Sequence, residues 1–495
     1  MKSLSTKDGF EFVNYLEEEF NFQNWKIEGV DVWPEMRIHI INLIDSIGRV
    51  NSKYPAWKVF PEFLGLINIL KQFFLHSDKF IHSYNQCDIL FLTYSTAKQS
   101  KIQGKWFNSF IDPVINVLNS VKKFHNTRFQ ILEYSPLYNY KIPGWSDSKM
   151  IQPTIFLNKF KARLLERNLD LNQSKKYIDI INGEIDSKLG LNIKVELNYI
   201  AKRASQTIAN RNFFYGILKK CKPSVVILSN YYGLEKAMCL ACSELNIPVV
   251  DIQHGAQGEF HFAYGQWKSV PINGYNTLPD LFAEWGEGEK KVIDSWAHKT
   301  KHQATEIGNG FAEFVSELRE ENPELEEIKK KEKPKILISL QPNRGIDTVY
   351  YELLVQNQGR FLFYFRSHPT MTKEEVRDIK SELSDFNNCY FHESSSILLY
   401  KLLPFMTAHI TQNSSVTIEA KSFGVPTVLI HQSGYDLFFS IIDNKTVFFS
   451  TEPDKIFNLL EQIGRNKQNL FDHSKDLSYR KNMSRLISNF IIGKD

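Results

Sequence analysis

The amino-acid sequence predicts an α/β protein made of two Rossmann-like, doubly wound domains that face each other across a cleft. Three observations predict this fold class. A strand, a helix and a second strand follow one another between residues 224 and 253, with the spacing of a βαβ unit in a parallel sheet. The same alternation repeats between residues 335 and 431. A highly charged stretch at residues 316–334 separates the two regions.

The first region contains continuous apolar runs, which are typical of strands buried on both faces of a parallel sheet. Ser224–Ser229 and Pro248–Gln253 are such runs, and the segment Gly233–Leu245 between them predicts a helix. Further strands are expected at Ile89–Tyr94, Arg128–Tyr134, Leu281–Glu284 and Thr305–Ile307, and a long helical stretch at Ile155–Cys221.

The second region alternates between short apolar strands and amphipathic helices. Strands are expected at Lys335–Leu340, Phe361–Phe365, Cys389–His392, Ala408–Thr411 and Pro426–His431, and helices at Ser395–Leu402, Val416–Phe423, Lys455–Ile463 and over the last twenty residues. These patterns divide the chain into an N-terminal domain (residues 1–315), a charged linker (316–334), a C-terminal domain (335–473) and a C-terminal helix (474–495) that packs back over the junction.

Composition narrows the class of protein. The 495 residues exceed what one hydrophobic core usually serves, and 42% hydrophobic with 23% charged residues is ordinary for a globular chain. Lysine and arginine (60) exceed aspartate and glutamate (56) by four, which is too few for a nucleic-acid-binding domain.

The sequence favours a cytoplasmic location. No apolar run reaches the roughly 20 residues of a membrane-spanning helix, and the first residues lack the apolar core of a secretory signal. Five cysteines without a framework spacing fit reduced thiols. Cys239 and Cys242 form a C-x-x-C pair inside the predicted helix at 233–245, and we interpret them as buried packing residues.

The first candidate site follows the strand Phe361–Phe365. The planar guanidinium group of Arg366 can donate two hydrogen bonds to a phosphate, and His368 can bind a second phosphate oxygen. Pro369 ends the strand. A purely structural strand end fits these four residues as well.

The second candidate site is Thr411-Gln-Asn-Ser414-Ser415, between a strand and a helix. Hydroxyl groups at a helix start suit a nucleotide phosphate, although Ser414 or Ser415 must also cap the helix. A capping box needs an acid three residues after the cap, where Thr417 and Ile418 stand. Glu419 is therefore not needed for capping, and its carboxylate can accept hydrogen bonds from two ribose hydroxyls.

The third candidate site is Gln253-His254-Gly255, after the strand Pro248–Gln253. His254 has a side chain suited to general-base catalysis, and a hydrogen-bonding role is the alternative. Other candidates for acid–base work are Asp251, Glu259, His261 and Glu284. We expect His261 and Lys105 to contact the second substrate, the acceptor, on the N-terminal side of the cleft. Lys105 belongs to the polar loop Lys98–Trp106, which can equally be an ordinary solvated loop.

Several motifs are missing. There is no Asp-X-Asp, and the C-x-x-C of Cys239 and Cys242 has no second cysteine or histidine pair to complete a metal site, so we expect no metal and no other cofactor. A P-loop, a G-x-G-x-x-G and a G-x-S-x-G are also missing, which disfavours kinases, dehydrogenases and hydrolases.

The ordered set of motifs nevertheless resembles a known group. Five motifs follow one another along the chain. They are Gln253-His254-Gly255, Leu278-Pro-Asp280 with Trp285-Gly286, Ile307-Gly308-Asn309, Arg366-x-His368-Pro369, and Ser414-Ser415 with Glu419. In this order they resemble those of bacterial surface-polysaccharide glycosyltransferases of the GT-B fold. This group includes capsule polymerases, polysialyltransferases, Kdo transferases and teichoic-acid polymerases. The resemblance covers residues 224–430, about 40% of the chain.

The resemblance implies a role for each matching residue. His368, Ser414 and Ser415 would contact the donor phosphate, and Glu419 the ribose. The acidic motif that supplies the base in polysialyltransferases is missing here, so His254 takes that role from the teichoic-acid relatives.

The implied function is metal-independent transfer of a sugar from a CMP-, UDP- or GDP-linked donor to a capsule or lipopolysaccharide glycan, free or lipid-linked, on the cytoplasmic face of the inner membrane. The alternatives are a CDP-polyol phosphotransferase and a non-catalytic nucleotide- or glycan-binding assembly protein.

Overall fold

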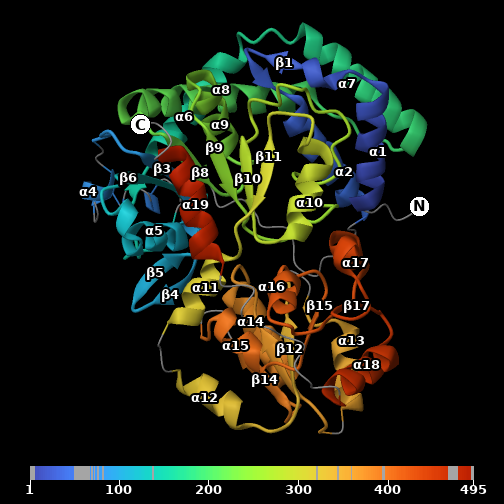
Figure 1. The fold of residues 1–495 in the computed structure, drawn as a ribbon. Helices are drawn as coiled ribbons and strands as arrows, with labels where there is room; N and C mark the ends of the chain where they lie inside the picture. The colour runs from blue at the N-terminus through green and yellow to red at the C-terminus, as the bar shows by residue number, and fades with distance from the viewer. Residues whose placement is uncertain are drawn as a thin grey trace.

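The protein is divided into two α/β domains, each built on one parallel sheet. In Figure 1 the blue-to-green N-terminal domain lies above the orange C-terminal domain. The computed structural model describes residues 6–48, 67–68, 71, 73–74, 77–80, 83–136, 139–318, 322–342, 345–357, 359–392, 396–465 and 478–491.

The N-terminal domain contains a seven-stranded sheet in which the described strands pair in parallel. The order across the sheet is β11-β10-β9-β8-β3-β6-β7, so the chain starts at a central strand and winds outward in both directions. Its strands are β3 (Ile89–Tyr94), β6 (Phe129–Tyr134), β7 (Lys149–Met150), β8 (Val225–Leu228), β9 (Val249–Ile252), β10 (Leu281–Glu284) and β11 (Gln303–Glu306).

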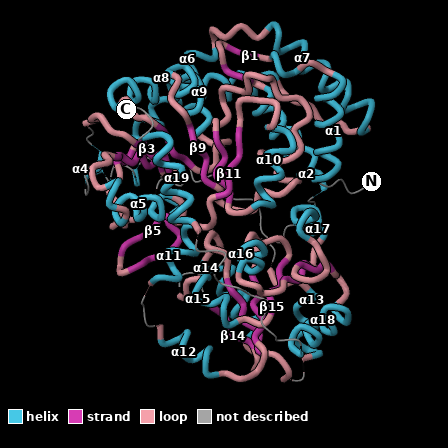
Figure 2. The backbone as a smooth tube through the Cα atoms, viewed as in Figure 1, coloured by secondary structure: helices cyan, strands magenta, loops and turns pink. Residues whose placement is uncertain are grey.

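Alternate strand residues enter opposite layers of this domain. Leu90 and Leu228 pack in one core cluster with side chains of α8 and α9, whereas Phe91 and Ile227 pack in another with α5 and α19. Figure 2 shows helices on both sides of the strands. The helices of this domain are α1 (Thr6–Glu19), α2 (Trp33–Gly48), α4 (Ser77–Phe80), α5 (Ile111–Ser120), α6 (Gln152–Glu166), α7 (Asn172–Glu184), α8 (Leu197–Cys221), α9 (Glu235–Leu245), α10 (Glu287–Ala297) and α11 (Gly310–Glu317).

The C-terminal domain contains a six-stranded parallel sheet of order β14-β13-β12-β15-β16-β17. The winding direction reverses between β12 and β15, which is where doubly wound sheets bind ligands. Its strands are β12 (Lys335–Ser339), β13 (Leu362–Arg366), β14 (Cys389–His392), β15 (Ala408–Thr411), β16 (Thr427–Leu429) and β17 (Val447–Phe449). Its helices are α12 (Pro323–Lys330), α13 (Thr348–Gln356), α14 (Lys373–Leu383), α15 (Leu399–Leu402), α16 (Val416–Ser422), α17 (Gln432–Phe438) and α18 (Pro453–Arg465).

The charged segment at 316–334 is partly folded. Asn322 caps α12 by accepting a hydrogen bond from the Leu325 N–H at 3.0 Å. Leu325 and Ile328 are buried in one cluster with residues of the second sheet, and the charges face outward. Residues 319–321 of the predicted linker lie outside the described residues.

The C-terminal helix α19 (Tyr479–Ile491) packs on the N-terminal sheet, and Figure 1 shows it in red against that domain. The Glu313 carboxylate of α11 accepts hydrogen bonds from the N–H groups of Tyr479 and Arg480, at 3.0 and 3.1 Å, and so caps α19. Residues 474–477 and 492–495 of the predicted C-terminal segment lie outside the described residues.

Three predicted segments fold differently in detail. The helix predicted at 395–402 is present as α15 only from Leu399, and residue 395 lies outside the described residues. The helical stretch predicted at 155–221 is divided among α6, α7 and α8, with a break at Gly190 where φ is +61°. The polar loop predicted at 98–106 is a hairpin of β4 (Lys98–Ile102) and β5 (Lys105–Asn108), whose turn residues Gln103 and Gly104 both have positive φ. Phe107 of this hairpin is fully buried and stacks on Phe314 of α11 at 4.5 Å between ring centroids.

Candidate functional site

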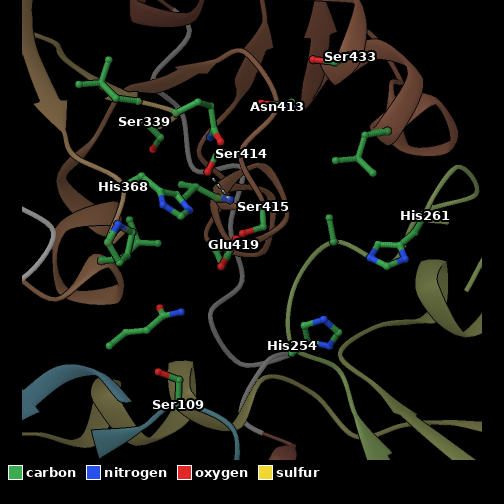
Figure 3. Close-up of a pocket in the computed structure, with 18 of the residues that line it drawn as sticks. Ser109, His254, His261, Ser339, His368, Asn413, Ser414, Ser415, Glu419 and Ser433 are labelled. Carbon is green, nitrogen blue, oxygen red and sulfur yellow. Dashed lines mark hydrogen bonds between the residues drawn. The ribbon is translucent and has the colours of Figure 1, made fainter. Parts of the chain in front are cut away.

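A cavity of about 620 Å³ lies between the two domains, at the carboxyl ends of their strands. The C-terminal domain contributes the segments that follow β12, β13 and β15, and the N-terminal domain contributes the segment that follows β9. Figure 3 shows His368, Ser414 and Glu419 on one side of this space and Ser109, His254 and His261 across from them. A volume of this size suits a small organic ligand.

Four buried polar atoms without a partner border this cavity. They are the hydroxyl of Ser109, the amide nitrogen of Gln341, the amide oxygen of Asn413 and one carboxylate oxygen of Glu419, out of nineteen such atoms among the described residues. Most buried polar groups in proteins are satisfied, and a polar ligand in the cavity would satisfy these four.

His368 follows the end of β13 and presents one ring nitrogen to the cavity. Its Nδ1 accepts a hydrogen bond from the Thr370 N–H at 3.2 Å and lies 2.8 Å from the Thr370 hydroxyl. Because an N–H group can only donate, Nδ1 is the unprotonated nitrogen and Nε2 carries the proton. Burial lowers the pKa of His368, which favours this neutral form. The side chain therefore offers an N–H donor that suits a phosphate oxygen.

The two serines lie at the start of α16. The N–H of Val416 donates to the Ser414 hydroxyl at 3.3 Å, so Ser414 is partly engaged in ending the preceding loop. Ser415 makes no capping hydrogen bond with its side chain. The hydroxyl of Ser415 is therefore the better placed of the two to contact a ligand.

Glu419 lies one turn into α16 and is 8% exposed. Burial raises its pKa to about 8, and the nearby carboxylate of Glu289 adds to this effect. Tyr400 lines the same wall, and its hydroxyl accepts a hydrogen bond from the Asn309 side chain at 2.8 Å. The free oxygen of Glu419 can accept hydrogen bonds from vicinal hydroxyl groups.

Arg366 lines the cavity, but its guanidinium group has a structural contact. It is 8% exposed, and its Nη1 donates to the backbone carbonyl of Ile397 at 2.7 Å. Burial lowers its pKa to about 10. This contact ties the end of β13 to the segment before α15, and it uses one of the five N–H donors of the guanidinium group. Arg366 also lines the cavity, so the phosphate contact expected from the sequence stays a prediction.

His254 lies at the cavity wall after β9, and both ring nitrogens have protein neighbours. Nε2 is 3.0 Å from the Tyr232 hydroxyl, and Nδ1 is 3.5 Å from the Gln257 amide. The Gln257 amide satisfies both Glu284 and His254 in one orientation. Its nitrogen then donates to the two Glu284 oxygens at 2.8 and 3.0 Å, and its oxygen faces Nδ1 of His254. Nδ1 then carries the proton, and Nε2 is the unprotonated nitrogen that accepts a hydrogen bond from the Tyr232 hydroxyl.

Glu284 does not reach the cavity. It is 1% exposed at the end of β10, burial raises its pKa well above the usual range, and it contacts His254 only through Gln257. Its expected catalytic role therefore becomes a positioning role. Asp251 is likewise 1% exposed and accepts a hydrogen bond from the Tyr264 hydroxyl at 2.7 Å.

His261 lines the cavity, whereas Glu259 does not. Nδ1 of His261 accepts a hydrogen bond from the Ala263 N–H at 3.2 Å, so its Nε2 carries the proton, and burial lowers its pKa to about 3. Figure 3 places His261 at the edge of the cavity near His254. Glu259 instead accepts a hydrogen bond from Gln266 at 3.4 Å.

Lys105 is not brought to the cavity. It is exposed and follows the two-residue turn of the β4–β5 hairpin. Gln99 and Ser100 of β4 line the cavity instead. The segment 98–106 therefore reaches the cavity, but through other residues than the predicted Lys105.

Sequence analysis missed several lining residues. Ser109, Gln341, Tyr400 and Asp436 border the cavity. Asn309, which belongs to the motif Ile307-Gly308-Asn309 but was given no role, borders it as well. Asn309 and Gln341 follow strand ends, which is a signal that the sequence offered, whereas Asp436 comes from α17, and only tertiary packing brings it to the site.

The described part of the chain contains neither a cluster of metal ligands nor a helix that could span a membrane. No three His, Cys, Asp or Glu side chains in that part of the chain are grouped so that they could hold a metal ion. No described helix has both the length and the apolar character needed to cross a membrane.

Comparisons with known proteins yield structural likeness only. No protein-family model and no curated protein sequence matches the chain. Among solved structures, a protein named as a UDP-N-acetylglucosamine 2-epimerase from Listeria monocytogenes is similar, with 11% identity, a TM-score of 0.50, and coverage of 83% of this chain and 98% of its own.

Two further structures are less similar. The UDP-GlcNAc 2-epimerase of Neisseria meningitidis, bound to UDP-GlcNAc, has 14% identity and a TM-score of 0.48, over 82% of this chain and 100% of its own. The wall teichoic acid polymerase TagF has 11% identity and a TM-score of 0.46, over 88% and 98%.

The chain has the GT-B fold. Its two doubly wound domains with a cavity between their strand ends are that arrangement, and the likeness to the Listeria structure extends over most of both chains. The predicted fold class is therefore confirmed.

Proposed function

We propose that this chain is a glycosyltransferase that moves a sugar from a nucleotide-sugar donor to a growing bacterial surface glycan. One observation carries the proposal: buried, unpartnered polar atoms of both domains converge on one cavity that also holds the N–H of His368. A nucleotide sugar supplies phosphate oxygens and hydroxyl groups, which are the partners these atoms need.

On the donor side, His368 and Ser415 would bind the phosphate and Glu419 the ribose. A second cavity of about 810 Å³ shares Glu419, Tyr400, Asn309 and Trp285 with the first. A ribose held at Glu419 would therefore have room for the sugar phosphate on one side and for the base on the other.

On the acceptor side, His254 would act as the base. An acceptor hydroxyl takes the place of the Tyr232 hydroxyl at Nε2, and its oxygen bonds to the anomeric carbon while that carbon's bond to the phosphate oxygen breaks. The hydroxyl proton passes to Nε2, and the nucleotide leaves with the electron pair. The N–H of His368 stabilises the charge that grows on the departing phosphate.

We propose that the reaction needs no metal and no other cofactor, as the missing Asp-X-Asp motif predicts. Transfer should then continue in excess EDTA at an unchanged rate. A loss of activity that Mg²⁺ or Mn²⁺ restores would contradict this part of the proposal.

The test is a donor panel. The purified full chain is incubated with UDP-, GDP- and CMP-sugars and with CDP-glycerol and CDP-ribitol, with and without capsule or lipopolysaccharide oligosaccharides, and released nucleotide and sugar-bearing product are measured. We expect one nucleotide sugar to be consumed with an acceptor. His368→Ala should lower that rate by about 10²-fold or more, and the exposed His298→Ala serves as the matched control.

Other outcomes would point to other functions. Consumption of a CDP-polyol would indicate phosphotransfer, and an epimerised sugar without nucleotide release would indicate an epimerase. Nucleotide binding without turnover of any donor would indicate an assembly protein. Each of these results contradicts the proposal.

A further inference from the structure

Helix α6 carries an outward row of apolar side chains. Leu157, Phe160 and Leu164 are 58%, 50% and 64% exposed, and their spacing of three and four residues places them on one face. They make up three of the eight exposed large hydrophobic side chains among the described residues. Scattered exposed apolar residues need no explanation, but a row on one helix does.

The orientation of this face is fixed by packing. The opposite side of α6 is buried through Ile155, Asn158 and Ala162, and α6 contacts α8 along its length. The Asn158 side chain donates to Asn210 of α8 at 3.0 Å. The apolar row therefore cannot turn inward without unfolding this part of the domain.

Cations flank the apolar row. Lys161, Arg163 and Arg167 are exposed, and within the described part of the chain they form no ion pair. The guanidinium of Arg163 lies 5.6 Å from the ring centroid of Phe160. A helix with a cationic and an apolar outer surface is typical of proteins that lie in the headgroup layer of a bilayer.

A hollow of about 610 Å³ continues the cationic surface between α6 and α8. Lys159, Arg163, Lys202 and Arg203 line it, and Glu166 is its only acidic lining residue. Arg203 also pairs with Glu35 at 2.6 Å, whereas Arg163 and Lys202 form no ion pair with another described residue. With four cations and one acid, the lining suits the phosphate of a lipid headgroup.

We propose that this α6 face (Leu157, Phe160, Lys161, Arg163, Leu164 and Arg167) docks the protein on an anionic lipid bilayer. Phe160 and its apolar neighbours enter the acyl boundary, and the cations contact lipid phosphates. A symmetric contact with a second copy would set Lys161, Arg163 and Arg167 against like charges, so charge complementarity favours the membrane.

Docking would leave the candidate site accessible. No residue of α6 lines either cavity between the domains, and Figure 1 shows α6 at the end of the N-terminal domain away from the C-terminal domain. The proposal does not depend on the proposed chemistry, and its test needs no substrate.

Vesicle flotation of the full chain tests the docking face. The protein should float with vesicles of 30% phosphatidylglycerol in phosphatidylcholine, bind pure phosphatidylcholine much less, and dissociate in high salt. Phe160→Ser should weaken partitioning by about tenfold, and Lys161→Gln with Arg163→Gln by about fivefold for each cation.

Matched variants separate the α6 face from general surface effects. Val355→Ser removes an apolar side chain on α13 that is more exposed than Phe160, at 71% against 50%, and Lys175→Gln with Lys176→Gln removes two exposed cations on α7. Both should float like the parent protein. Equal loss in these controls would overturn the proposal, and so would equal binding to neutral vesicles or a dimer in sedimentation that Phe160→Ser abolishes.

Discussion

The carboxyl group of Glu419 should change its charge between pH 7 and 9. Burial raises its pKa to about 8, and ribose hydroxyls donate hydrogen bonds to the ionised form. Nucleotide affinity should therefore rise as pH increases, by about tenfold between pH 7 and 9, as the ionised fraction grows. His368 stays neutral in this window because burial lowers its pKa. Calorimetric titration of UDP, GDP and CMP measures the profile.

The control for this prediction is Glu419→Gln, which cannot ionise. Its nucleotide affinity should be weaker and flat across the same pH range. If the variant and the parent protein show parallel profiles, another group is responsible and Glu419 does not hold the ribose.

Gln257 links a buried carboxyl group to the candidate base. Gln257→Leu removes the amide between Glu284 and His254, so the Nδ1-protonated form of His254 loses its acceptor. We expect kcat to fall by about tenfold with little change in the donor KM. In ¹⁵N NMR spectra of histidine-labelled protein, the His254 signals should shift from the Nδ1-protonated pattern. An unchanged tautomer would refute the positioning role.

At the scale of elements, α11 and α19 meet at a glycine. A Cβ at Gly310 would lie 2.4 Å from the Tyr479 ring and 2.8 Å from Pro113. Gly310→Ala should therefore destabilise the protein by about 1–3 kcal/mol through overpacking, measured by urea denaturation. Gly216→Ala in α8 meets nothing within 4 Å and should be neutral or stabilising by up to about 1 kcal/mol. Equal effects would show that the α11–α19 contact is not tight.

The sequence predicted elements best where local pattern decides the structure. The strand at 89–94 is confirmed at both ends, because a parallel strand buried on both faces is a continuous apolar run. The strand at 389–392 is also confirmed at both ends, although it lies at the edge of its sheet and is only partly buried. The hairpin at 98–108 was missed, because its strands read as polar and its stability comes from Phe107 packing on α11. Helix α12 was obscured by charge, although Leu325 and Ile328 anchor it.

At the scale of the whole molecule, predictability depends on how far apart the contributing residues lie in sequence. Ligands of open α/β sheets bind beyond the carboxyl ends of the strands, and this rule predicted that His254, His368 and Ser415 lie near one cavity, as they do. It could not show that Arg366 holds the Ile397 carbonyl or that Glu284 reaches His254 only through Gln257. Those roles depend on side-chain packing between segments that sequence pattern treats separately.

The two-domain site implies a division of labour, and one pair of variants tests it most directly. Nucleotide affinity and sugar transfer are measured for His254→Ala and His368→Ala, with folding checked by circular dichroism. The account predicts that His254→Ala binds nucleotide within about threefold of the parent protein yet transfers no sugar, while His368→Ala loses at least about tenfold in nucleotide affinity. Equal nucleotide affinity in both variants, or transfer by His254→Ala at the parent rate, would contradict it.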